Sequence, residues 1–500
     1  MSIKTTETDV VVIGSGSTGM VAALTAAEGK AKVILLEKMQ SMGGVSNFAE
    51  GMFAAESDMQ RQQYVSYSRD DAFKTIMEYS HWRANPHVVR TFVDETASTI
   101  AWLQAQGVEF VEVTTNMPGG PLVWHILKGP ERERGSLMIK TLASRAKGKG
   151  VDFWLATRAK KLIKGASPGK DQSGGNKVTG IIVEKDGEEL RIDAKAIIIA
   201  TGGYANNKEW IKKYSGFDLG INLTPVGNVD KMGDGIRMAW EIGSAEEGMG
   251  VLQLLRGGPL MGAGLSFMGP LESAANQPSL WINQDGERYC DESIQGNFAF
   301  DGNAMARHRG KSVYALFDES ILHHWMEKGT DLGTGRIFPP GSRLDIGKSL
   351  KEAQEQKTPG VFAADSIEEL ARAMGLNPAV LKATVVEYNG FCEKGHDDFF
   401  AKDPKYLRPL KGPKFYGLKC NLVFLGTLGG IKINHKMEVV DKKENPIPGL
   451  YAGGMDAGGI YGDSYDVKTC GGTLSFGVNS GRIAGKNALI YIGKSLPTSL

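Results

Sequence analysis

Cysteine is scarce in this sequence of 500 residues, which contains four cysteines. Cys290, Cys392, Cys420 and Cys470 are far apart, so the sequence has no C-x-x-C pair of the kind that zinc ribbons use. The spacing also excludes the usual iron–sulfur ligand patterns and the C-x-x-C-H haem attachment site. Scattered thiols are typical of a reducing compartment. We therefore expect neither disulfides nor a metal site.

Long apolar runs are also missing. No stretch of about 18 apolar residues is present, and the N-terminal residues Met1–Asp9 lack the apolar core of a signal peptide. The 58 Lys and Arg residues nearly balance the 57 Asp and Glu residues, which leaves a formal net charge of +1. Such a chain has no overall field to attract nucleic acid or an anionic membrane. The sequence predicts a cytoplasmic protein with no transmembrane segment and no nucleic-acid partner.

Glycine, in contrast, is abundant and clustered. The chain has 65 glycines, nearly twice the usual share of about 7%. Clustered glycines are typical of backbone that lies close to a ligand. The apolar run Asp9–Gly14 predicts a buried strand, Ser17–Gly29 a helix and Lys32–Glu37 a second buried strand. These elements form a βαβ unit of about the usual length.

The turn of this unit carries the pattern G-x-G-x-x-G, formed by Gly14, Gly16 and Gly19. Gly14 allows a tight turn, Gly16 lets the backbone approach a pyrophosphate, and Gly19 lets the helix pack closely on the strand. The N-terminus of the helix then presents free N–H groups to the phosphates. Glu37 ends the second strand, where an acidic residue binds a ribose. The pattern predicts a dinucleotide site, but NAD and FAD both use it.

Several other elements are predicted by periodicity and turn residues. Residues 70–107 have helical spacing, and the predicted helix ends at Gly107. Lys177–Val183 and Glu189–Ile192 flank an Asp-Gly turn and predict a β-hairpin. Ala196–Gly203 predicts another buried strand that ends in glycines.

Three glycine-rich segments resemble flavoprotein signatures, and they occur in the same order along the chain as in flavoproteins. The first is Glu37–Asn47, which contains Lys38, Gly43 and Gly44 and resembles the loop that flavoproteins wrap along FAD. The others are Ala200–Gly203 and Pro448–Gly454. This resemblance favours FAD over NAD.

Taken together, the motifs resemble the fumarate reductase/succinate dehydrogenase flavoprotein superfamily, in the branch that includes urocanate reductases, fumarate reductases and 3-ketosteroid dehydrogenases. Further motifs that carry the resemblance, and that extend it over nearly the whole chain, are Met232–Ile236, Asn283–Glu292, Thr427–Asn434 and Ser480–Gly485.

The resemblance implies an α/β fold. A Rossmann-like FAD-binding domain of the two-dinucleotide-binding type would be formed by residues 1–255 and 426–500. An α+β cap domain, residues 256–425, would be inserted between them and would carry the substrate site. The active site would lie at the interface of the two domains, above the flavin.

The resemblance also implies which residues bind FAD. They are Gly14, Ser15, Gly16, Thr18, Gly19, Glu37, Lys38, Gly43, Gly44, Ser46, Asn47, Ala159, Ala200, Thr201, Gly202, Asp234, Gly454, Asp456, Thr473, Leu474 and Ser475. Family members that attach FAD covalently use a histidine beside the glycine loop. Residues Gly44–Asn47 contain no histidine, so we expect non-covalent FAD.

The chain departs from the pattern of the fumarate reductases at three positions. Gly296 stands where they have an arginine proton donor, and Gly426 stands where they have a substrate-binding histidine. Lys468 lies at or near the place of their second carboxylate-binding arginine. A dicarboxylate needs paired, fork-like cations, and lysine does not replace arginine there. The departures therefore disfavour fumarate and succinate as substrates.

Two tyrosines are the main catalytic candidates. Tyr461 and Tyr465 lie in a segment that resembles the tyrosine-bearing turn of ketosteroid dehydrogenases, so Tyr465 is expected to polarise a carbonyl or transfer a proton, or else to form a wall of the site. A phenol is a better proton donor than base at neutral pH. Lys468 and Glu292 are further candidates for substrate binding and acid–base chemistry.

Three other side chains, Arg132, Arg134 and His125, lie in a segment that borders the substrate in the family. The apolar stretch Gly257–Met268 is expected either to line a pocket or to form core.

These features predict an FAD-dependent oxidoreductase that acts on a CH–CH or C=C bond next to a carbonyl, with an apolar or cyclic enone as substrate. One alternative is a reductase of a small unsaturated acid held by Lys468. Another is a flavin subunit that only transfers electrons within a redox complex. Each reading requires an external electron donor or acceptor, which is NAD(P)H, a quinone or a redox protein. The sequence does not determine the direction of the reaction.

Overall fold

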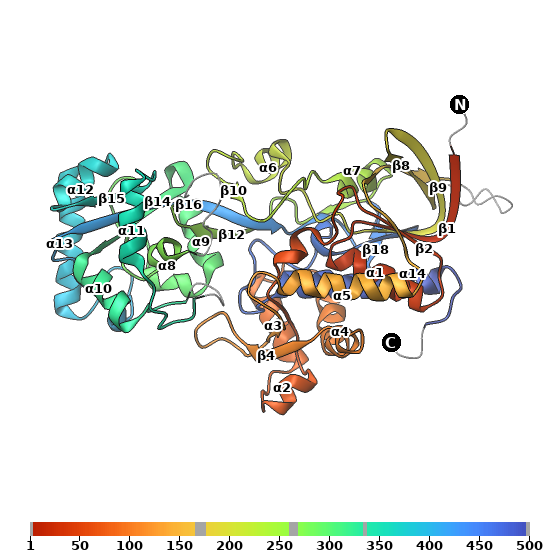
Figure 1. The fold of residues 1–500 in the computed structure, drawn as a ribbon, viewed down its shortest axis with the longest axis horizontal. Helices are drawn as coiled ribbons and strands as arrows, with labels where there is room; N and C mark the ends of the chain where they lie inside the picture. Colours follow the sequence, from red (N-terminus) through yellow and green to blue (C-terminus); the bar gives the residue numbers. More distant parts are fainter. Residues whose placement is uncertain (1–3, 166–176, 260–268, 334–337, 497–500) are drawn as a thin grey trace.

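The structure, a computed structural model, describes residues 4–165, 177–259, 269–333 and 338–496. The molecule is elongated (Figure 1). An eight-stranded sheet lies at one end together with both ends of the chain, and a six-stranded sheet with its own helices lies at the other.

The eight-stranded sheet contains the βαβ unit. Its main path has the order β18-β19-β9-β1-β2-β6, and the β7–β8 hairpin extends it from β9. The strands are β1 (Lys4–Ile13), β2 (Val33–Leu36), β6 (Asp152–Trp154), β7 (Thr157–Lys164), β8 (Val178–Lys185), β9 (Glu188–Ile199), β18 (Glu438–Val440) and β19 (Pro446–Ala452). β1 pairs in parallel with both β2 and β9. Parallel strands in the middle of a sheet are covered on both faces, which explains their continuous apolar runs.

Two helices from opposite ends of the chain, α1 and α14, pack on this sheet, and two further helices pack on them. The four helices are α1 (Ser17–Glu28), α4 (Pro86–Ala105), α5 (Arg134–Gly148) and α14 (Gly472–Tyr491). α1 packs against both α5 and α14, and α14 also packs against α4. The first and last helices of the sheet's domain therefore lie side by side, and the C-terminal segment completes the fold that the N-terminal segment begins.

The six-stranded sheet is built around β16, a long strand that runs from the far end of the molecule towards the first sheet (Figure 1). β16 pairs with β10, β12, β14 and β15, and β14 pairs with β13. The strands are β10 (Thr224–Pro225), β12 (Leu252–Gly257), β13 (Leu280–Ile282), β14 (Ser312–Asp318), β15 (Val361–Ala364) and β16 (Phe415–Thr427). The helices around them are α8 (Pro270–Ala275), α9 (Phe298–Ala306), α10 (Glu319–Lys328), α11 (Ile346–Glu355), α12 (Ile367–Met374) and α13 (Pro378–Lys394).

Smaller elements connect the two sheets. β3 (Gly51–Phe53), β5 (Trp124–Leu127) and β4 (Phe110–Thr114) form a three-stranded sheet, and β11 (Glu246–Glu247) pairs with β17 (Gly430–Ile431). The remaining α-helices are α2 (Asp58–Gln62), α3 (Arg69–Tyr79), α6 (Lys208–Ser215) and α7 (Asp234–Glu241).

The prediction of one helix over residues 70–107 is wrong. The structure has two helices, α3 and α4, separated at residues 80–85. Pro86 is the first residue of α4, and the Asn85 side chain accepts hydrogen bonds from the N–H groups of His87 and Val88. Proline fits the first turn of a helix and not its interior, so a new helix begins there.

The predicted β8–β9 hairpin is confirmed, with Lys185 opposite Glu188. The expected strand at Ala196–Gly203 is not a separate element. Its first four residues are the end of the long strand β9, which pairs first with β8 and then with β19, and residues 200–203 lie beyond the end of β9.

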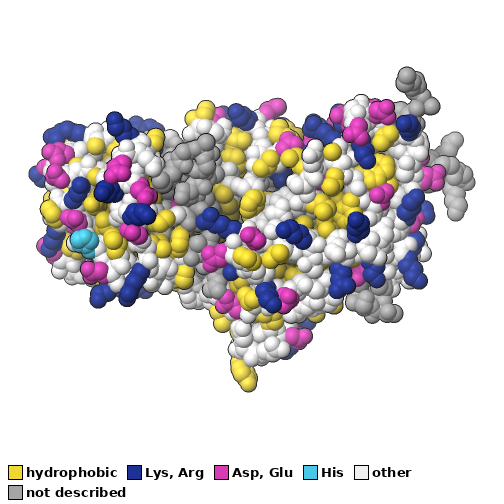
Figure 2. All heavy atoms as spheres, viewed as in Figure 1, with side chains coloured by type: hydrophobic (Ala, Val, Ile, Leu, Met, Phe, Trp, Pro, Cys, Tyr) yellow, Lys and Arg dark blue, Asp and Glu magenta, His cyan; other side chains and the backbone are white. Residues whose placement is uncertain are grey.

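The α/β fold is confirmed. The division at residues 255 and 425 stays a prediction, and β12 and β16 each cross one of its limits. Among the described residues no helix is long and apolar enough to cross a membrane, and no group of His, Cys, Asp and Glu side chains could hold a metal ion. On the face shown in Figure 2, acidic and basic side chains are interspersed.

Candidate active site

The glycine turn lies between β1 and α1. Gly14 adopts a left-handed φ of 106°, and a Cβ atom on Gly19 would lie 1.8 Å from the carbonyl oxygen of Gly14. Gly16 is different, because a Cβ atom there would meet nothing closer than Ser46 Oγ, at 3.6 Å. Gly14 and Gly19 are therefore required by the fold itself, whereas the free space beside Gly16 faces a cavity that Gly16 lines.

Polar contacts fix this turn against the second strand and the loop after it. Glu37 accepts hydrogen bonds from the Ser15 N–H at 3.0 Å and from the Ser15 hydroxyl at 2.6 Å. Ser15 Oγ in turn accepts a hydrogen bond from the Gly43 N–H, at 3.1 Å. The Ser46 hydroxyl, in the short helical turn Gly44–Phe48, accepts a hydrogen bond from the Ser17 N–H at 3.0 Å. The loop is thus held close to the N-terminus of α1.

Asp456 connects the C-terminal glycine segment to the end of β9. Its carboxylate accepts hydrogen bonds from the Thr201 hydroxyl at 2.9 Å and from the Gly202 and Gly203 N–H groups at 3.0 Å each. Burial raises the pKa of Asp456, while these hydrogen bonds act in the opposite direction. The three glycine-rich segments of the sequence therefore meet beside the carboxyl ends of β2, β9 and β19 in the eight-stranded sheet.

Asp234, at the start of α7, is the centre of an ion-pair cluster. Lys38 lies 3.2 Å from its carboxylate, and Arg158 lies 3.0 Å away. Burial acts to raise the pKa of Asp234, but Lys38 and Arg158 outweigh it and hold this pKa below its ordinary value. Lys38 and Asp234 thus form an ion pair with each other, and neither residue is part of the lining of the cavity beside Gly16.

A cavity of about 560 Å³ lies between these loops, the N-terminus of α14 and the six-stranded sheet. The expected cofactor residues that line it are Gly16, Thr18, Gly43, Ser46, Ala200, Gly202, Gly454, Thr473 and Leu474. The expected cofactor residues outside this lining are Gly14, Ser15, Gly19, Glu37, Lys38, Gly44, Asn47, Ala159, Thr201, Asp234, Asp456 and Ser475.

Most of the second group support the residues that line the cavity. The Asn47 side chain donates a hydrogen bond to the Met42 carbonyl at 3.0 Å, and Ser475 donates to the Phe53 carbonyl at 2.7 Å. Ala159 is buried in β7 opposite Val183. The cavity itself fits a dinucleotide, because two helix N-termini without side-chain caps, those of α1 and α14, begin at its wall.

Residues 9–473 match a family model described as an FAD binding domain. The chain belongs to this FAD-binding family. It is an FAD-dependent oxidoreductase of the fumarate reductase superfamily, as the glycine segments predicted.

This flavoprotein is 34% identical to a vinyl phenol reductase of Lactiplantibacillus plantarum, over 97% of this chain and 96% of that protein. Its fold is similar to the open conformation of a flavocytochrome c3 fumarate reductase, with a TM-score of 0.72 and 25% identity over 97% of this chain and 78% of the other. It is also similar to a 3-ketosteroid-Δ4-(5α)-dehydrogenase from Rhodococcus jostii RHA1, with a TM-score of 0.75 and 21% identity over 96% of each chain.

Tyr465 lines the cavity of this flavoprotein, at its boundary with the cap. Its ring stacks on that of Phe298 from α9, with 5.6 Å between the ring centroids and an interplanar angle of 18°. Its hydroxyl forms hydrogen bonds with the Gly472 backbone and the Thr473 side chain, at the start of α14. Burial nevertheless raises the pKa of Tyr465 above its ordinary value, so the phenol is neutral at physiological pH.

Tyr461 is buried beside Tyr465, with 5.5 Å between their ring centroids, but it is not part of the lining of the cavity. Burial also raises the pKa of Tyr461. The structure therefore separates the two tyrosine candidates, and only Tyr465 reaches the cavity.

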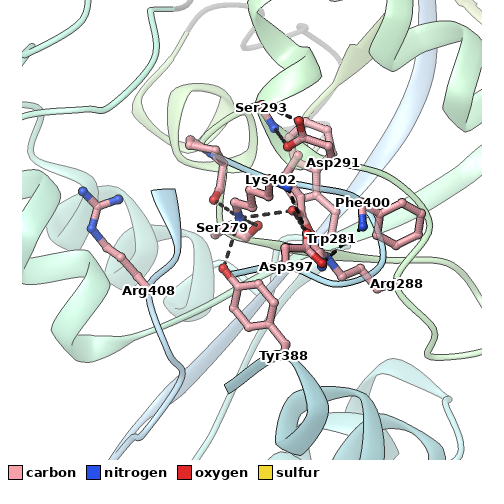
Figure 3. A network of polar contacts seen from close by, with 12 residues as sticks. Ser279, Trp281, Arg288, Asp291, Ser293, Tyr388, Asp397, Phe400, Lys402 and Arg408 are labelled. Carbon is pink, nitrogen blue, oxygen red and sulfur yellow. Dashed lines mark hydrogen bonds and ion pairs between the residues drawn. The ribbon is translucent and has the colours of Figure 1, made fainter. Parts of the chain in front are cut away.

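Two of the catalytic candidates, Lys468 and Glu292, do not line the cavity. The Lys468 side chain is exposed. Glu292 is fully buried in the cap, where it pairs with Arg288 at 2.7 Å and with Lys402 at 3.1 Å. Figure 3 shows this network, in which Lys402 also donates a hydrogen bond to the Tyr388 hydroxyl at 3.0 Å. The Glu292 oxygens are used by two buried cations, so this carboxylate belongs to the ion-pair network of the cap and does not face the cavity.

The segment that contains Arg132 contributes one lining residue. Arg132 lines the cavity with a left-handed φ of 67°, and its N–H donates a hydrogen bond to Glu50 at 3.3 Å. Arg134 instead pairs with Glu50. His125 is buried 2.6 Å from the Ser57 hydroxyl, and burial lowers its pKa to about 4. His125 is therefore a neutral core residue.

Two of the three departures from the fumarate reductase pattern are explained by packing. A Cβ atom on Gly426 would lie 2.8 Å from the sulfur of Met455, a lining residue, so Met455 fills the space that a longer side chain at 426 would need. A Cβ atom on Gly296 would lie 3.3 Å from the Pro118 ring. Neither position presents a cation to the cavity.

The lining residues that were not identified from the sequence include Gln253, Phe298 and Lys231. Gln253 comes from β12, Phe298 from the start of α9 and Lys231 from the loop before α7. In the sequence, the one indication of these residues was that Gln253 interrupts a run of leucines, Leu252–Leu255. From residue 260 onwards, the stretch expected to line an apolar pocket lies outside the described residues.

Proposed function

We propose that this flavoprotein reduces a carbon–carbon double bond conjugated to an uncharged group, either a carbonyl or a phenol ring, and binds FAD without a covalent link. The observation that carries this proposal is the chemistry of the cap side of the cavity. There the described lining residues are Val226, Gly227, Gln253, Phe298 and Leu425, and none of them is charged. A dicarboxylate would need paired cations at this place.

The relative named vinyl phenol reductase supports the same class of substrate. A vinyl phenol is an uncharged, planar, aromatic alkene. Phe298 and Tyr465 offer aromatic surface at the cavity wall, and aromatic rings bind one another in offset or edge-to-face arrangements. The ketosteroid dehydrogenases share only their fold with this chain, so they do not narrow the choice of substrate further.

Gln253 is the residue that would orient such a substrate. Its side chain is only 4% exposed and lines the cavity, and no hydrogen bond of its amide is present among the described residues. This amide faces the cavity. It can both donate to a carbonyl and accept from a phenol hydroxyl. We assign Gln253 the polar contact with substrate.

When bound, FAD supplies two electrons as a hydride to one carbon of the double bond. The other carbon needs a proton, and negative charge develops on the conjugated oxygen or ring. The neutral Tyr465 phenol can donate a hydrogen bond or a proton towards that charge, because its oxygen already accepts hydrogen bonds at the start of α14. The positive end of α14 also stabilises negative charge at this wall.

Each reduction of substrate leaves the flavin oxidised, so a second reaction must return two electrons to it. We therefore propose an external electron donor, either NAD(P)H, a quinone or a redox protein, and a cytoplasmic location. The reverse reaction, a dehydrogenation, uses the same groups. In the alternative, Lys468 would bind the carboxylate of a small unsaturated acid. The position of Lys468, exposed and outside the lining, does not support this alternative.

The proposal is tested by anaerobic reoxidation. The reduced enzyme is mixed with 4-vinylphenol, a cyclic enone or fumarate, and the return of the oxidised flavin absorbance is followed. We expect rapid reoxidation by at least one uncharged substrate and slow reoxidation by fumarate. Rapid reoxidation by fumarate alone would overturn the assignment.

The role of Gln253 is tested with Gln253→Leu and the pair 4-vinylphenol and styrene, which differ only in the hydroxyl. The variant should lose its preference for the substrate that carries the hydroxyl, mainly through KM. An unchanged preference would show that Gln253 does not make this contact. Gln253→Glu, which keeps the shape of the side chain, serves as the matched control for packing.

A further inference from the structure

Lys231 is a cation in the cofactor cavity that forms no ion pair among the described residues. Within the part of the chain that the structure describes, its ammonium group donates one hydrogen bond, to the Thr201 carbonyl at 3.3 Å. The neighbouring lysine, Lys38, is instead neutralised by Asp230 at 2.9 Å and by Asp234 at 3.2 Å. Lys38 thus uses Asp230 and Asp234. The other carboxylates near Lys231, those of Glu37 and Asp456, accept hydrogen bonds from Ser15 and from the Thr201–Gly203 segment, and Lys231 lines the cavity.

The position of the ammonium group places it at the dinucleotide end of the cavity. A Cβ atom on Gly202 would lie 2.6 Å from Nζ of Lys231, and one on Gly44 would lie 3.2 Å from it. Gly44 follows Gly43, whose N–H is hydrogen-bonded to Ser15 in the turn before α1. Nζ of Lys231 therefore lies between two glycine loops, beside the turn that leads into α1.

The backbone presents this lysine in a fixed position. The Lys231 N–H donates to the Asn206 side chain at 2.8 Å, and the Lys231 carbonyl accepts from the Asn206 N–H at 2.9 Å. Burial lowers the pKa of Lys231 and outweighs the opposite effect of Asp456 and Glu37, neither of which forms an ion pair with it. A buried charge without a partner is costly, and an anionic ligand would remove that cost.

We propose that Lys231 binds the diphosphate of FAD and supplies the positive charge that the N-terminus of α1 does not. A helix N-terminus carries about half an elementary charge, which is less than the charge of a diphosphate. Only one other cationic side chain, Arg132, is found among the described lining residues. Arg132 lies beside Glu50, in the loop before α5, and not beside Gly44 or Gly202.

The test is to titrate the apoprotein with three ligands: FAD, ADP and riboflavin. ADP contains the diphosphate without the flavin, and riboflavin contains the flavin without the diphosphate. Lys231→Met should raise the Kd for FAD and for ADP by about ten- to hundredfold, the usual range for a hydrogen bond to a charged group. The Kd for riboflavin should not change. Lys231→Arg should largely restore the binding of FAD and ADP.

The matched control is Lys208→Met, at an exposed lysine of α6 in the same domain, which should bind all three ligands as the wild type does. Thermal melting of each apoprotein checks the fold, and Lys231→Arg remains informative if Lys231→Met does not fold. The wild-type Kd for ADP should also rise with salt more steeply than that of Lys231→Met. Two results would overturn the proposal: unchanged binding of FAD and ADP, or a loss for riboflavin as large as that for FAD.

Discussion

Alanine at Gly16 is expected to impair cofactor binding while the apoprotein stays folded, whereas alanine at Gly19 is expected to damage the fold. The two glycines belong to the same motif, and each substitution adds a single methyl group. A Cβ atom on Gly16 would lie 3.6 Å from Ser46 Oγ and 3.8 Å from the Gly43 carbonyl oxygen, which are ordinary contacts. The φ of Gly16 is −64°, which any residue adopts.

The expected magnitudes follow from these distances. Gly16→Ala should change the free energy of unfolding of the apoprotein by about 0.5 kcal/mol or less. The methyl group would, however, enter the cavity that Gly16 lines and weaken hydrogen bonds to a charged phosphate, each worth about 1.5–3 kcal/mol. The Kd for FAD should therefore rise at least tenfold. Gly19→Ala would bring Cβ to 1.8 Å from the Gly14 carbonyl, and such overpacking costs about 3 kcal/mol or more.

The assay combines denaturant unfolding of each apoprotein, followed by circular dichroism, with fluorescence titration of FAD. The reasoning would be refuted if Gly16→Ala bound FAD within about twofold of the wild type. It would also fail if Gly16→Ala destabilised the apoprotein as much as Gly19→Ala does.

Three further predictions concern the wall of the cavity and the cap. Tyr465→Phe should lower kcat by about a hundredfold or more, because a donor towards developing charge is lost; Tyr461→Phe should have a much smaller effect, and similar losses in both variants would contradict the assignment. Lys468→Met should leave KM unchanged for every substrate, and a large rise in KM for an unsaturated acid would restore the carboxylate-anchor hypothesis. Burial raises the pKa of Glu272 from 4.5 to about 7, so the folded protein binds more protons than the unfolded chain between these values, and stability should fall by up to about 3 kcal/mol as pH rises through this window. Melting curves of the wild type and Glu272→Gln between pH 5 and pH 8 test this, and an equal pH dependence in both would contradict it.

The cofactor side of the site could be predicted from the sequence because its constraints are local. Gly14 and Gly19 are required by a turn whose atoms are all within a few residues, so the motif is visible without a structure. The break before Pro86 was also visible as a proline, although the apolar periodicity on both sides suggested one helix.

The substrate side could not be predicted in the same way. Gln253, Phe298 and Tyr465 come from separate parts of the chain and meet only because β12 and α9 pack beside the start of α14. The resemblance to ketosteroid dehydrogenases favoured Tyr465, but it did not show that the packing of this segment brings Tyr465 to the cavity and keeps Tyr461 behind it. Glu292 was a candidate for acid–base chemistry because of its charge. Its partner Lys402 is distant in the sequence, and the sequence alone does not distinguish Arg288 from a surface arginine.

The central claim is that the cap side of the flavin cavity accepts an uncharged conjugated alkene and not a carboxylate. The most direct measurement is stopped-flow reoxidation of the reduced enzyme by a matched pair, an aryl enone and the corresponding aryl acrylate, which share the ring and the double bond and differ in charge. The structure predicts that the enone half-saturates the reaction at a concentration at least about a hundredfold lower, because no described lining residue on the cap side is charged and an unpaired carboxylate there costs several kcal/mol. Half-saturation by the acrylate at an equal or lower concentration would contradict the account.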